Sequence, residues 1–113
     1  MPERNKIKPP PKETIPALSP MEYEFEAELM KLLAHPGRLA VIDQLLEGPK
    51  TVKELWSAMK LPQSTVSQHL ALLRGRGVVL GRREANSVTY EVIHPIVRKL
   101  CKILAESRKL RTG

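Results

Sequence analysis

Side chains that form hydrogen bonds crowd residues 64–69. Their hydroxyl and amide groups can bond to base edges and phosphates in the major groove of DNA. Residues 55–83 include no Asp or Glu, so nothing in this window would repel a polyanion. The pattern predicts DNA contacts, and an ordinary polar surface helix is the alternative interpretation. The candidate DNA-contacting residues are Gln63, Ser64, Thr65, Ser67, Gln68, His69, Arg74, Arg82 and Arg83.

A helix would present most of these side chains on one face. Val66, Leu70 and Leu73 fall at i, i+4 and i+7, which is one apolar stripe of an α-helix. Ser64 and Gln68 then lie roughly opposite that stripe. We expect the stripe to pack on a core and the polar face to point outward, as in a recognition helix.

The preceding residues predict a second helix joined to the first by a tight turn. Thr51 and Glu54 form a T-x-x-E capping box that opens this helix, and residues 60–62 end it. Residues 61–63 form the turn, so helix, turn and helix give a helix-turn-helix. The expected buried side of the preceding helix consists of Val52, Leu55, Trp56 and Met59.

A β-hairpin is expected after the recognition helix. Residues 78–80 and 88–92 are β-rich runs, and residues 81–87 between them are polar, as in a hairpin tip. Arg82 and Arg83 near this tip suit phosphate or minor-groove contact, although two adjacent arginines on a loop are often merely solvated. The hairpin completes a winged helix-turn-helix.

Three further helices give a mainly helical α+β fold in the order helix, helix, helix, helix, strand, strand, helix. The first is capped by Ser19 and runs to about residue 33, the second covers about 37–46, and the last covers about 95–108. His35, beside Pro36 at the start of the second helix, is expected to cap or pack. The first helix carries more large apolar residues than one small core needs, which predicts packing against a partner subunit. These residues are Met21, Tyr23, Phe25, Leu29 and Met30.

Composition supports a nucleic-acid partner. The 113 residues carry a net charge of +7 and a pI near 9.9. This charge favours a polyanionic partner such as nucleic acid, and an anionic membrane surface is the less favoured alternative. No apolar run of about 18 residues and no signal-peptide core appears, so we expect a cytoplasmic protein without a membrane partner.

The chain divides into one domain and two short ends. Residues 1–17 combine prolines with Lys and Arg, which predicts a disordered basic arm, more often a solvated tail than a DNA contact. Residues 18–108 are expected to form a DNA-binding and dimerisation domain, and residues 109–113 a disordered tail.

Cys101 is the one residue through which the chain could sense redox state by thiol chemistry. A single cysteine excludes an intrachain disulfide. Arg98 and Lys102 could activate its thiol, but a cysteine at the margin of an apolar stripe is more often inert packing. His69 lacks an obvious nucleophile or carboxylate, and no phosphate-binding loop is present. We therefore expect no enzyme and no cofactor.

The order of elements and two motifs resemble the ArsR/SmtB family of repressors. The motifs are Leu-Leu-Ala-His-Pro-Gly-Arg-Leu at 32–39 and Ser-Thr-Val-Ser-Gln-His-Leu at 64–70, and the resemblance covers about residues 24–104. It implies a winged-helix homodimer that pairs through its first and last helices and binds an imperfect palindrome in a promoter. It also implies that residues 64–70 are the recognition helix and residues 82–87 the wing.

The chain departs from the family pattern at the sensor positions. The cysteine pair of the family falls on Trp56 and Ala58, neither of which is a metal ligand. Of the four positions of the terminal zinc site, only His94 can bind metal, and one imidazole cannot hold a four-coordinate zinc ion. We therefore expect no metal site and a capping role for His94. A transcriptional repressor is the predicted function, with a thiol-responsive repressor or a protein-interaction module as alternatives.

Overall fold

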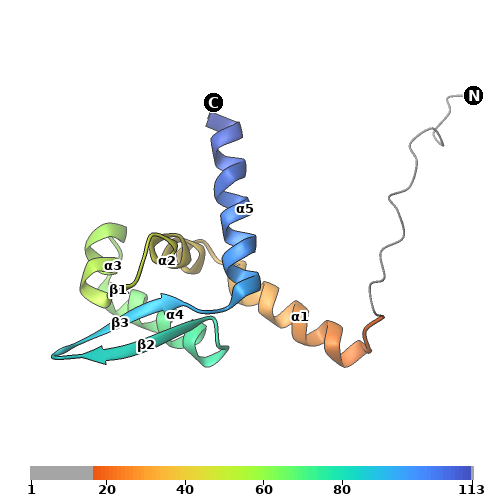
Figure 1. The fold of residues 1–113 in the computed structure, drawn as a ribbon, viewed down its shortest axis with the longest axis horizontal. Helices are drawn as coiled ribbons and strands as arrows, with labels where there is room; N and C mark the ends of the chain where they lie inside the picture. Colours follow the sequence, from red (N-terminus) through yellow and green to blue (C-terminus); the bar gives the residue numbers. More distant parts are fainter. Residues whose placement is uncertain (1–16, 113) are drawn as a thin grey trace, which may run out of the picture.

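The structure is a computed structural model, and it describes residues 17–112. Within this range the chain forms five helices and a three-stranded sheet, which confirms the mainly helical winged helix-turn-helix (Figure 1). Almost all of the expected basic arm, residues 1–17, lies outside the described residues. The elements are α1 (Pro20–Leu33), α2 (Pro36–Leu46), β1 (Lys50–Thr51), α3 (Val52–Met59), α4 (Gln63–Gly75), β2 (Val79–Glu84), β3 (Ser87–Val92) and α5 (Pro95–Thr112).

The core lies where α2 and α4 pack against each other, the sheet and α5. The stripe predicted for α4 is confirmed, because Val66, Leu70 and Leu73 are all buried. In contrast, α1 buries only Leu33 among its residues, so most of its apolar surface contributes nothing to this core. The buried apolar residues are Leu33, Val41, Ile42, Leu45, Leu55, Val66, Leu70, Leu73, Val78, Val79, Val92, Val97 and Cys101.

Local capping explains where the first helices begin. The Ser19 side chain accepts from the Glu22 backbone N–H, and the Glu22 carboxylate accepts from the Ser19 N–H at 2.8 Å. At α2, His35 is the N-cap residue, and its Nδ1 accepts from the Gly37 N–H at 3.0 Å. The capping roles expected for Ser19 and His35 are confirmed.

The helix-turn-helix has the expected boundaries and one unexpected side chain. Thr51 and Glu54 form the reciprocal capping box of α3, and Lys60 ends the helix in the left-handed conformation, with φ of 56°. Leu55 is buried, but Trp56 is 41% exposed, so its expected burial was wrong. The indole directly follows Leu55 in the chain and therefore points about 100° away from the buried stripe of this eight-residue helix.

The wing is longer and its tip tighter than the sequence indicates. Residues 81–84 belong to β2 instead of a loop, and the turn consists of Ala85 and Asn86, with φ of 54° at Ala85. A Cβ at Gly81 would lie 2.9 Å from the Tyr90 ring, so glycine makes room for the tyrosine inside the strand pair. β1, which the sequence analysis missed, pairs antiparallel with β3 through Lys50 and Thr51.

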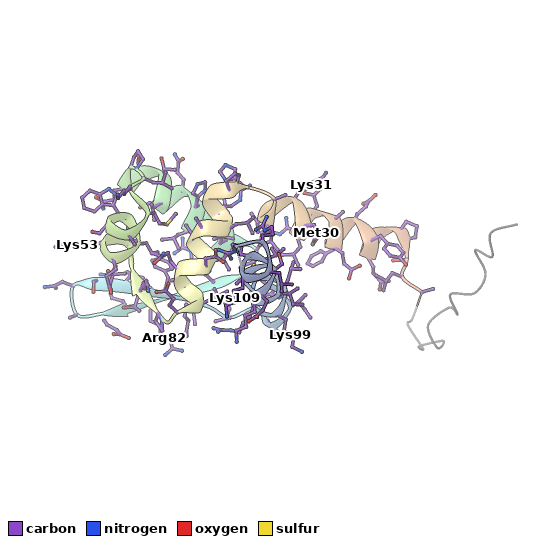
Figure 2. The ribbon with its side chains drawn as sticks, turned by 90° about the horizontal axis from the view of Figure 1, so that it is seen from above. Met30, Lys31, Lys53, Arg82, Lys99 and Lys109 are labelled. Atoms are coloured by element: carbon purple, nitrogen blue, oxygen red, sulfur yellow. The ribbon has the colours of Figure 1, made fainter. Side chains whose placement is uncertain are left out.

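The terminal helices project from the rest of the molecule. Figure 1 shows α5 rising alone from the body and α1 extending to one side. α5 continues to Thr112, so residues 109–112 are helical and the expected disordered tail is not present there. In Figure 2, Met30 and Lys31 lie on α1 near the end that joins the body.

Candidate nucleic-acid interface

The outward face of α4 collects most of the candidate DNA-contacting residues. Gln63, Ser64, Ser67 and Gln68 are exposed, and Thr65 at the margin of this face is half-buried. At about 100° per residue, Arg74 returns to the same face as Ser67. The face therefore offers two amides, hydroxyls and one guanidinium to the surroundings. Such donors and acceptors can bond to base edges and phosphates.

The beginning of α4 also suits an anionic partner. Pro62 is the N-cap residue and has no side chain able to cap the helix, and the first turn carries no acidic residue. The N–H groups at a helix start and the helix dipole favour a phosphate. α3 differs, because Thr51 and Glu54 already occupy its first N–H groups. The two helices of the motif thus differ in what they offer to DNA.

His69 does not belong to this face. It is 7% exposed and lies on the side of α4 that packs on α2, with its ring centroid 4.8 Å from that of His35. The prediction that His69 contacts DNA was wrong, because a side chain buried between two helices cannot reach a base. The helical spacing already indicated burial of His69, because it lies three residues after Val66 and next to Leu70, on the buried flank of the helix.

The tertiary structure places a carboxylate beside residues 55–83, which include no Asp or Glu. Arg82 Nη2 on β2 lies 2.7 Å from Glu91 Oε1 on β3. The carboxylate therefore partly neutralises this guanidinium and holds its orientation. Arg83, the next residue, points to the other face of the strand pair, and the described residues give it no ion pair. Arg83 is the freer of the two for a phosphate.

Comparison with known proteins identifies the kind of molecule to which this interface belongs. The model of the arsR family of bacterial regulatory proteins matches residues 35–80. Transcriptional repressor PagR of Bacillus anthracis is 39% identical over 85 residues, 74% of this chain and 85% of PagR. An HTH-type transcriptional regulator of Mycobacterium tuberculosis is 39% identical over 89 residues, 78% of this chain and 75% of its own.

A solved structure agrees with these relatives. HlyU from Vibrio cholerae superposes with a TM-score of 0.73 at 34% identity, covering 78% of this chain and 96% of HlyU. The protein is a member of the ArsR family. It is accordingly a DNA-binding transcriptional regulator with a winged helix-turn-helix.

The thiol of this ArsR-family protein is poorly placed for redox chemistry. Cys101 is 1% exposed on the inner side of α5. Burial raises the pKa of its thiol, and the nearby Asp43 carboxylate raises it further, while Arg108 opposes them. The reactive thiolate is therefore disfavoured. The activating effect expected from Arg98 and Lys102 does not contribute to this pKa shift.

The described residues also contain no group of three or more His, Cys, Asp or Glu side chains able to hold a metal ion. His94 Nδ1 accepts weakly from the Val97 N–H at 3.4 Å, at the start of α5, as expected of a cap. None of the helices in residues 17–112 is long and apolar enough to cross a membrane.

Proposed function

We propose that this ArsR-family regulator is a repressor that binds a palindromic promoter operator as a homodimer formed through α1 and α5. The observation that carries the proposal is the apolar surface that these two helices leave without a partner. Met21, Phe25 and Met30 of α1 are 76%, 69% and 53% exposed. A core side chain is normally far less exposed, so this surface is suited to a second protein surface.

α5 presents the same feature in a regular form. Ile96, Ile103 and Leu110 recur every seven residues and are 59%, 64% and 85% exposed. A seven-residue repeat returns to nearly the same face after two helical turns, which is the pattern of a helix that packs along another helix. Fully burying each such side chain contributes about 1.5–3 kcal/mol, so several together can hold two subunits.

Cys101 and Lys102 lie on other faces of α5 than this repeat. Val97 and Cys101 point to the core, and Lys102 lies on the solvent side of the helix. α5 thus has one face for its own domain, one for a second copy, and one for water. A second copy related by a two-fold axis would cover identical residues on both subunits.

A two-fold dimer explains why the operator should be palindromic. Two copies of α4 related by a two-fold axis read two copies of the same half-site in opposite directions, about one helical turn, 34–36 Å, apart. Within each half-site, Ser64 and Gln68 would read bases, while Arg83 and the start of α4 would bind phosphates. Arg82 would contribute less than Arg83 because Glu91 partly neutralises it.

Repression follows if such an operator overlaps the promoter. PagR is named a transcriptional repressor, and it shares with this chain the helix-turn-helix and the wing. The redox-responsive alternative loses support from the burial of Cys101, so we propose no thiol signal.

The test combines selection of bound DNA from a random pool with sedimentation of the protein at micromolar concentration. We expect a dimer and selected sequences that contain an inverted repeat. A folded monomer, or selected sites without two-fold symmetry, would contradict the proposal.

A further inference from the structure

A pair of histidines joins the recognition helix to α2. We name as the α2–α4 joint the contact formed by His35, Gly37 and Arg38 at the start of α2 with His69 on α4. His35 Nδ1 accepts a hydrogen bond from the Gly37 N–H at 3.0 Å, so this nitrogen carries no proton in the structure. A proton there would remove the N-cap of α2 and add positive charge at the positive end of its dipole.

His69 is buried without a hydrogen bond to its Nδ1. The residue is 7% exposed, and Nδ1 has no partner among the described residues. A Cβ on Gly37 would lie 2.5 Å from His69 Nε2, so the imidazole occupies the space that glycine leaves open. This packing leaves little room for the water that a charged imidazole requires.

The electrostatic surroundings of His69 also oppose a positive charge. Burial lowers the pKa of His69, and the nearby His35 and Arg38 lower it further. These two groups of α2 are the titratable and charged side chains that face it, and no carboxylate of the described residues contributes to the shift. The His69 imidazole can therefore take up a proton only if its packing against His35 and Gly37 loosens.

We propose that the α2–α4 joint makes DNA binding sensitive to acid: the operator-binding arrangement of α4 requires an uncharged His69 packed against His35 and Gly37, and protonation of His69 weakens it. The proposal rests on the operator binding proposed above. It adds a signal, the proton, to a molecule whose thiol is buried and whose described residues contain no metal cluster.

The sign of the effect follows from the direction of the shift. A histidine whose pKa is lowered by packing stabilises the packed state fully above its ordinary pKa of 6.5. This contribution is lost as the pH falls from that value toward the lowered pKa, because the loosened state takes up the proton first. One such proton weakens operator binding by up to about tenfold between about pH 7.5 and about pH 5.5.

The background effect of DNA has the opposite sign. A polyanion attracts protons to any exposed histidine near it, which raises affinity in acid. A fall in operator affinity on acidification is therefore a specific sign of the joint.

The variants that test the proposal remove the titration and keep the packing. His35→Asn retains an N-cap side chain, and His69→Gln retains a polar group of similar reach without a titratable imidazole. His94→Asn is the matched control, because His94 also stands before a helix but lies outside the joint. With operator DNA, the unmodified protein and the His94→Asn variant should lose at least about threefold in affinity at about pH 5.5, and the double variant His35→Asn/His69→Gln should lose none.

A second measurement needs no variant. The imidazole resonances of the three histidines, followed by NMR through a pH titration, should give His69 a lower pKa with operator bound than without it. An equal pKa in both states, an operator affinity that does not fall in acid, or a fall that persists in the double variant would overturn the proposal. If the protein failed to bind a selected operator at about pH 7.5, the proposed function would fail instead.

Discussion

Gln68 tests the role of α4 at the scale of a single residue. The side chain is exposed on the outward face of the helix, where its amide can pair with the edge of a base. Gln68→Ala should cost about 1–3 kcal/mol of operator binding and relax the preference at one base position. Titration of labelled operators with single base changes measures both effects. Gln44→Ala, the same truncation on α2, is the control, and equal losses in the two variants would contradict a base-reading role.

Arg82 and Glu91 allow a residue-scale test of the wing. Their ion pair, at 2.7 Å, withholds part of the Arg82 charge from DNA. Glu91→Gln should release it, so affinity for all sequences should rise by up to about 1 kcal/mol and the salt dependence should steepen. Glu84→Gln removes the same charge from the wing without breaking this ion pair. A gain of the same size in both variants would mean that net charge, and not the pairing, is responsible.

The capping box of α3 governs stability at the scale of an element. Glu54 accepts from the Thr51 N–H at 3.1 Å, and Glu54 donates its own N–H to the Thr51 hydroxyl at 3.2 Å. Thr51→Ala should lower the free energy of unfolding by about 1 kcal/mol, seen as a lower urea midpoint. Ser57→Ala, on an exposed position of the same helix, should leave the midpoint nearly unchanged.

The same capping box predicts how this element responds to acid. The hydrogen bonds from the Thr51 backbone and side chain lower the pKa of Glu54, and Lys50 adds a smaller effect in the same direction. The stabilisation is therefore complete above the ordinary value of 4.5 and is lost as the pH falls through the lowered pKa. Below that range the urea midpoints of the native protein and a Glu54→Gln variant, whose side chain cannot ionise, should converge. A constant difference between them would contradict the role of the carboxylate.

At the scale of the whole molecule, the exposed repeat on α5 predicts the oligomeric state. Ile103→Glu places a charge in the middle of the proposed interface, where burying it would be costly. Sedimentation should show a folded monomer, and operator affinity should fall because the two half-sites are no longer bound as a unit. Lys102→Glu is the control, since it changes the neighbouring charge on the solvent side of the helix. A dimer that survives Ile103→Glu would place the interface elsewhere.

Much of the fold could be predicted from the sequence because its signals are local. Apolar spacing located the buried stripe of α4, and the capping residues Ser19 and Thr51 marked the starts of two helices. Each of these features involves residues within two turns of one another. The set of exposed polar residues on α4 was predictable for the same reason, since helical spacing alone separates Ser64 and Gln68 from Leu70.

Only the tertiary structure decided the contacts between distant segments. Glu91 reaches Arg82 because two strands pair in one particular register, which determines which side chains share a face. Likewise, His69 meets His35 because α4 packs across the start of α2, 34 positions earlier in the chain. Local spacing allowed His69 to be taken for a DNA contact. Packing buries its side chain between α4 and α2, and this position depends on which helices pack together.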